Sequence, residues 1–152
     1  MKPLIALIVV FVISLGFTWI VIGEFNYSLA GAAGMCAMLL LTAFGHFRFR
    51  KGMQAMLPDV IPYRSAIIVL TGIIEIAAAI GLLIPQLKLL TGWLLIIFFA
   101  LILPANISAA IRRIDYQKGT ADGPGPAYLW FRIPLQLFFI GWVYFFVIYL
   151  KK

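Results

Sequence analysis

Five long apolar stretches decide what this chain can fold into: residues 3–23, 29–46, 65–85, 89–111 and 131–150. Only two charged side chains, Glu75 and Arg132, fall inside them. Each stretch is long enough to cross about 30 Å of hydrocarbon as an α-helix. Transmembrane β-strands would be about ten residues long with strict alternation, which these stretches lack. The sequence therefore predicts an all-α polytopic membrane bundle of five spans.

The composition also indicates an integral membrane protein, organised as one transmembrane domain over residues 1–152. Hydrophobic residues make up 64% of the chain and charged residues 11%, whereas soluble domains are about 45–50% apolar and about 25% charged. The first stretch has an alternative reading as a signal peptide, because Lys2 precedes it and residues 30–32 (AGA) loosely resemble a cleavage site. Its apolar run of about 20 residues exceeds the usual signal-peptide core, so we predict a true span.

Lysine and arginine predict the orientation. Five spans with the N-terminus inside place nine basic residues inside, namely Lys2, Arg48, Arg50, Lys51, Arg64, Arg112, Arg113, Lys118 and Arg132. Three remain outside, namely Lys88, Lys151 and Lys152. The positive-inside rule favours this arrangement in a bacterial cytoplasmic (inner) membrane. The formal net charge of +7 is then explained by lipid headgroups, and we expect no nucleic-acid partner.

Five polar side chains stand out by their depth in the predicted spans. At 1.5 Å per residue, four of them lie in the inner half and one lies near mid-membrane. They are His46, Asn106, Arg132 and Gln136, with Glu75 at the greatest depth. Because polar side chains avoid lipid, each should face the bundle interior. We therefore predict one ligand or proton site, a polar pocket that opens towards the inner face and has Glu75 at its floor.

Glu75 needs a partner or a proton, because an isolated carboxylate in hydrocarbon is very costly. Arg132 is the first candidate for its partner and His46 the second. Thr71 lies one turn from Glu75 on the same helix face. The alternative is that the buried polar groups simply bond across helices, at roughly 1 kcal/mol or less per pair. Pro104 should also kink its span and free the carbonyl of Ala100.

Several chemistries are excluded or carry no signal. A single histidine cannot ligate haem twice, and the chain has no His/Cys/carboxylate cluster typical of a metal site. There is no phosphate-binding or dinucleotide-binding glycine motif and no nucleophile elbow. The one cysteine, Cys36, reads as a small buried hydrophobe. We predict no catalytic residue and no metal ligand.

Five segments resemble the DoxX and DoxX-like family of small bacterial membrane proteins: GHFRF (45–49), MLPDVIP (56–62), TGIIEIAAAIGLLIP (71–85), LPANISAAI (103–111) and WFRIPLQ (130–136). The resemblance covers about residues 29–150 and implies a four-helix core preceded by one extra N-terminal span. It also implies a link to membrane-bound redox complexes. The family's recurring polar positions would fall on the five residues selected by depth.

Two functions follow as expectations. The first is a quinone- or lipid-binding subunit of a membrane oxidoreductase. It would hold no intrinsic cofactor and would need a soluble or membrane redox partner on the cytoplasmic side. The alternative is a non-enzymatic scaffold or assembly factor, in which the buried polar residues are helix-packing hydrogen bonds. A transporter ranks last, because the chain lacks the repeats and paired broken helices of such proteins.

Overall fold

The computed structural model describes residues 2–58, 60–115 and 117–151 as a helical bundle. Its long helices are α1 (Lys2–Ile22), α2 (Tyr27–Arg48), α4 (Arg64–Leu83) and α5 (Lys88–Ile111). The last span is composite, with η1 (Pro126–Tyr128), α6 (Leu129–Trp142), the π-helical η2 (Val143–Ile148) and η3 (Tyr149–Lys151). A short helix, α3 (Arg50–Met56), follows α2. The predicted fold class is confirmed, because five helices are long and apolar enough to cross a membrane.

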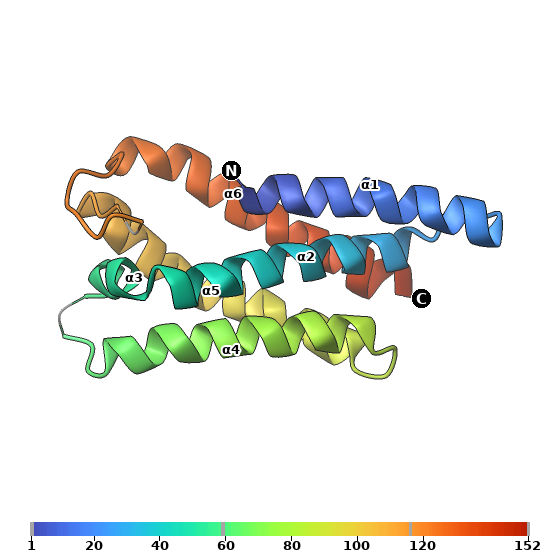
Figure 1. Cartoon of the computed structure of the whole chain (residues 1–152), viewed down its shortest axis with the longest axis horizontal. Helices are drawn as coiled ribbons and strands as arrows, with labels where there is room; N and C mark the ends of the chain where they lie inside the picture. The colour runs from blue at the N-terminus through green and yellow to red at the C-terminus, as the bar shows by residue number, and fades with distance from the viewer. Residues whose placement is uncertain (1, 59, 116, 152) are drawn as a thin grey trace.

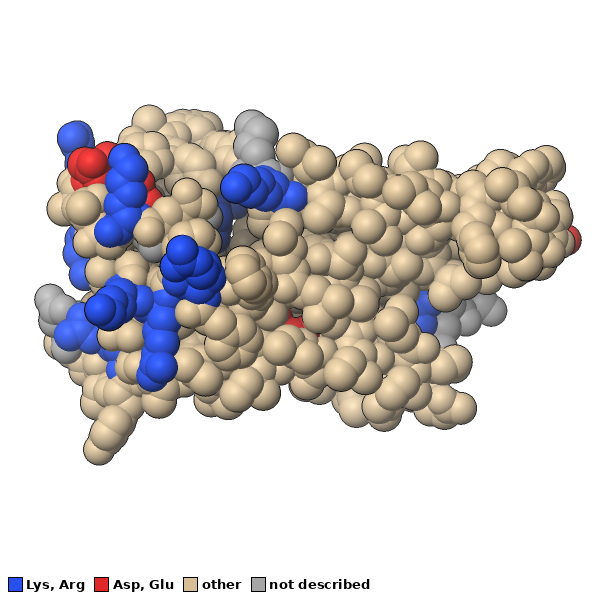
Figure 2. All heavy atoms as spheres, viewed as in Figure 1, with Lys and Arg blue, Asp and Glu red and all other residues tan. Residues whose placement is uncertain are grey.

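α2 lies at the centre of the bundle, packed between α1 and α4 and also against η2 (Figure 1). α5 packs against α4, α6 and η2. We call one end of the bundle the basic end; it is formed by α3, the last turns of α2 and α5, and the first turns of α4 and α6. Figure 2 shows lysine and arginine side chains gathered there, while the rest of this face is almost free of charge.

Glycines allow the closest helix contacts. A Cβ atom at Gly31 would overlap the Cβ atom of Phe146 in η2. One at Gly34 would lie 2.7 Å from the carbonyl oxygen of Leu7 in α1. The small residues of α2 therefore admit α1 and η2, as expected where close packing rather than the hydrophobic effect drives association. Leu7, fully buried, belongs to the core that these contacts seal.

α1 is displaced along the bundle. The backbone N–H of Asn26 donates to the Thr18 hydroxyl at 3.3 Å, so the start of α2 is level with Thr18 rather than with the end of α1. The helix continues for four residues, about 6 Å, beyond that level, and it begins about halfway along the bundle (Figure 1). Lys2 therefore does not lie at the basic end. That end holds the other eight residues predicted to be inside.

The last two spans contain irregular segments, and side chains of other helices donate hydrogen bonds to backbone carbonyls there. Pro104 lies inside α5, and Gln136 Nε2 donates at 2.9 Å to the carbonyl of Phe99, next to the one that Pro104 was predicted to free. In the π-helical segment, the Ser28 hydroxyl donates at 3.0 Å to the carbonyl of Phe146. Backbone carbonyls inside a membrane need hydrogen-bond donors, and these two side chains supply one donor to each irregular segment.

Candidate functional site

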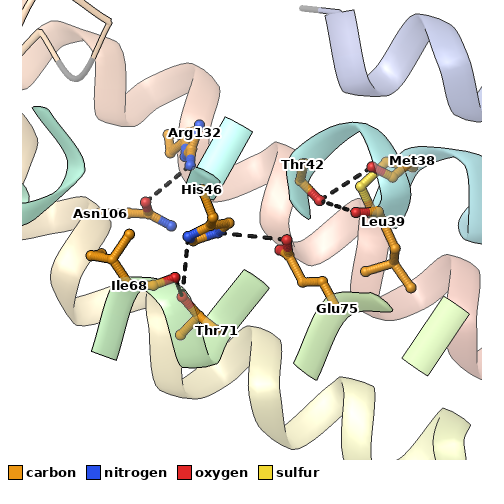
Figure 3. A network of polar contacts seen from close by, with 9 residues as sticks. All are labelled: Met38, Leu39, Thr42, His46, Ile68, Thr71, Glu75, Asn106 and Arg132. Carbon is orange, nitrogen blue, oxygen red and sulfur yellow. Dashed lines mark hydrogen bonds and ion pairs between the residues drawn. The ribbon is translucent and has the colours of Figure 1, made fainter. Parts of the chain in front are cut away.

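A carboxylate and an imidazole meet where α2 packs on α4 (Figure 3). Oε2 of Glu75 lies 3.5 Å from Nε2 of His46. Glu75 is 4% exposed, and the His46 side chain is 18% exposed. Gly72 makes the approach possible, because a Cβ atom there would lie 3.0 Å from Cβ of His46. Of the two candidates for the partner of Glu75, the structure pairs it with His46.

Thr71 completes this group from the same face of α4 as Glu75, one turn away. Its hydroxyl oxygen lies 3.1 Å from Nδ1 of His46. The same hydroxyl donates to the carbonyl of Ile68 at 2.8 Å. We call Thr71, His46 and Glu75 the α2–α4 triad. Thr42 lies one turn before His46 on α2, and in the described contacts its hydroxyl donates only to carbonyls of its own helix.

Asn106 and Arg132 form a second polar group, between α5 and α6. A guanidinium nitrogen of Arg132 donates to Oδ1 of Asn106 at 2.9 Å (Figure 3). Asn106 is 7% exposed. Its amide nitrogen Nδ2 is buried without a hydrogen-bond partner among the described residues. An amide nitrogen has two donor hydrogens, so Asn106 retains unused capacity to bind an acceptor.

A cavity of about 210 Å³ opens beside this pair at the basic end. Both polar and apolar groups line it, from α3, α5, the 112–125 loop and the start of the last span. They include Met56, Asn106, Ala109, Ala110, Arg113, Ile114, Asp115, Tyr128 and Arg132. We call it the α5–α6 cavity. Its side-chain donors are two amides, from Asn106 and Gln117, two guanidinium groups and a phenol, and its one acid is Asp115.

The loop that closes the cavity is held by its own contacts. Arg113 has a left-handed backbone, with φ of 54°, and its carbonyl accepts from the N–H of Gly123 at 2.7 Å. Oδ1 of Asp115 accepts from the N–H groups of Gln117 and Lys118. Further out, the Thr120 hydroxyl and then Lys118 lower the pKa of Asp122.

Arg112 ties the loop to α3, because its guanidinium donates to the carbonyl of Met56 at 2.5 Å. Sequence reasoning did not select Met56, Arg113 or Tyr128 as site residues. They lie in or near segments rich in glycine and proline, where depth along a helix has no meaning. The adjacent basic residues Arg112 and Arg113 are the one sequence feature that points to this cavity, and the sequence analysis uses them only to predict the orientation in the membrane.

The five predicted residues do not share one pocket. Asn106 and Arg132 line the α5–α6 cavity. His46 and Glu75 meet at the α2–α4 interface, and Gln136 is bonded to the α5 backbone. Glu75 is therefore not the floor of the cavity. Glu75, Asn106 and Gln136 are buried, His46 and Arg132 are partly exposed, and the contacts of the five side chains fall into three groups rather than one.

Comparison with known families corrects the resemblance proposed from the sequence. The matching family model is described as Domain of unknown function (DUF8561) and covers residues 35–147, which leaves α1 outside the match. The resemblance to the DoxX family, with its four-helix core, is therefore wrong. Small residues and proline are common in membrane helices generally, so short segments built from them do not identify a family. No curated protein and no solved structure matches the chain.

Proposed function

We propose that this chain, which belongs to the family described as Domain of unknown function (DUF8561), is a non-enzymatic membrane protein that binds the polar headgroup of an amphiphile. The binding site is the α5–α6 cavity. One observation carries the proposal: Nδ2 of Asn106 is buried with no hydrogen-bond partner among the residues that the structure describes, and Asn106 and Arg132 both line the cavity. An unmet buried donor costs about 1–3 kcal/mol, which a ligand oxygen would recover.

The lining favours a ligand rich in acceptor oxygens and attached to an apolar tail. Guanidinium groups only donate, the amide oxygen of Asn106 already accepts from Arg132, and Asp115 already accepts from loop N–H groups. The apolar part of the cavity lining includes Met56, Ala109 and Ala110. A volume of about 210 Å³ is below the roughly 300–1,000 Å³ of sites that enclose whole ligands. The cavity therefore suits a headgroup whose tail remains in the bilayer.

Two classes of amphiphile fit this description, lipids and quinones. Both offer oxygens to Asn106, but an anionic phosphate also gains charge-assisted bonds from Arg113 and Arg132. We therefore favour an anionic lipid over a quinone. We further propose that this end faces the cytoplasm across a bacterial inner membrane, which its eight basic residues support through the positive-inside rule.

Ligand protection of the purified full chain tests the proposal. In detergent micelles, short-chain phosphatidylglycerol is expected to raise the melting temperature at lower concentration than short-chain phosphatidylcholine or a benzoquinone analogue. Asn106→Leu removes the unused donor and is expected to weaken the phosphatidylglycerol effect about tenfold or more, the equivalent of one hydrogen bond to a charged group.

Thr42→Val serves as the matched control, because the Thr42 hydroxyl bonds to carbonyls of its own helix. Its ligand response should match that of the unchanged protein. Stronger protection by the quinone analogue would assign the same cavity to the other class of amphiphile. If none of the three probes protects the protein, or if both variants respond alike, headgroup binding is refuted and the scaffold alternative is favoured.

A further inference from the structure

The α2–α4 triad takes no part in the proposed headgroup site, and its hydrogen bonds constrain where protons lie. The Thr71 hydroxyl has one hydrogen and two neighbours, the carbonyl of Ile68 at 2.8 Å and Nδ1 of His46 at 3.1 Å. A carbonyl can only accept. The shorter contact favours donation to Ile68, and the hydroxyl oxygen then accepts from the imidazole. It follows that Nδ1 of His46 carries a proton.

This tautomer determines what Nε2 presents to Glu75. A neutral imidazole with a proton on Nδ1 has only a lone pair on Nε2. That lone pair faces Oε2 of Glu75 at 3.5 Å. An ionised carboxylate there would repel it, and Oε2 is buried without a hydrogen-bond donor among the described residues. A further proton between the two atoms removes the conflict, whether it belongs to an imidazolium or to a carboxylic acid.

We infer that His46 and Glu75 form a proton-binding site between α2 and α4, in which one proton is held between His46 Nε2 and Glu75 Oε2 while Thr71 fixes the imidazole tautomer. With that proton the pair is electrically neutral. Without it, a net negative charge would remain on a carboxyl group that is 4% exposed. Burial of an uncompensated charge is strongly unfavourable, so the neutral form is favoured.

Other charged side chains of the surrounding helices do not replace this proton. They are Lys2, Arg48, Arg50, Lys51, Arg64, Lys88 and Arg132. Arg50 donates to Ser65 and Arg132 to Asn106. Arg64 begins α4, eleven residues or about 16 Å before Glu75. Within the described part of the chain, Glu75 forms its ion pair with His46.

The single histidine of the chain makes the test direct. In the full chain labelled with a heavy nitrogen isotope in histidine, nuclear magnetic resonance reads the two ring nitrogens of His46 alone. At neutral pH we expect a protonated Nδ1 and an Nε2 signal shifted by a shared proton. In Glu75→Gln, the amide nitrogen can donate to Nε2 but carries no acid proton. Nε2 is then expected to shift to the value of a bare acceptor nitrogen, with Nδ1 still protonated.

Thr71 variants separate tautomer control from general packing. Thr71→Val keeps the shape of the side chain but removes the acceptor for Nδ1–H, so the ring proton is expected to move to Nε2 while the second proton stays on the Glu75 carboxyl group. Thr71→Ser retains the hydroxyl and should restore the original spectrum, and Thr42→Val should leave it unchanged. A bare Nδ1 in the unchanged protein, or an Nε2 signal that Glu75→Gln does not alter, would overturn the inference.

Discussion

Leucine in place of His46 is expected to lower the free energy of unfolding by about 3–5 kcal/mol, because removal of one member of a buried charged pair strands the other. Glu75 lies 3.5 Å from His46, and no described residue donates a hydrogen bond to its Oε2 atom. The loss of stability therefore comes mainly from leaving the buried Glu75 carboxyl group without a partner, and less from the missing contacts of the imidazole. Unfolding of the purified chain in mixed micelles with increasing sodium dodecyl sulfate measures it.

The double variant His46→Leu with Glu75→Leu is the informative control. Replacing a whole buried pair by apolar side chains is often neutral or stabilising, so most of the loss should be regained. The two single changes would then be strongly non-additive, as expected for groups in contact. Additive losses would show that the two side chains stabilise the bundle separately, contrary to the pairing seen at the α2–α4 interface.

Alanine in place of Gly31 is expected to lower the free energy of unfolding by about 1–3 kcal/mol, the usual cost of overpacking. The added Cβ atom would overlap the Cβ atom of Phe146. Phe146 cannot simply rotate away, because the overlap involves the first carbon of its side chain. The carbonyl of Gly31 also accepts from Nε1 of Trp142 at 3.0 Å, so separating α2 from the last span weakens that bond. The same micelle titration measures the effect.

Gly141→Ala provides the matched control for this change. A Cβ atom at Gly141 would meet nothing within 4 Å, and the residue lies in α6. Alanine is favoured over glycine in helices by about 0.5–1 kcal/mol, so stability should hold or rise slightly. Equal losses at the two positions would mean that backbone effects, rather than the contact with Phe146, explain the result.

The helical spans could be predicted because the bilayer imposes them. Any apolar stretch of about 20 residues must pair its own backbone groups inside hydrocarbon, and a helix does this without help from the rest of the fold. The same argument selected Glu75, because a carboxylate in such a stretch must find a partner or a proton. Neither prediction required knowledge of how the helices pack.

The choice of partners required more than depth. Position along a helix gives a height in the membrane but not the direction in which a side chain points around the bundle. His46 and Arg132 were both at suitable heights for Glu75, and only the packing of α2 on α4 through Gly72 selects His46. Arg132 instead meets Asn106 across α5 and α6. The single predicted pocket failed for this reason.

The displaced first helix has a consequence for the surrounding lipid. Because α1 begins about halfway along the bundle and passes beyond the level of Asn26, it does not occupy the same slab of hydrocarbon as α2, α4 and α5. Where Lys2 emerges, the leaflet at the basic end must thin or the ammonium must reach up to the headgroups. At its other end, α1 requires a locally thicker leaflet. The apolar surface of α1 is therefore offset along the bundle axis from that of the other spans, and we expect the bilayer beside α1 to differ in thickness from the bilayer on the opposite flank.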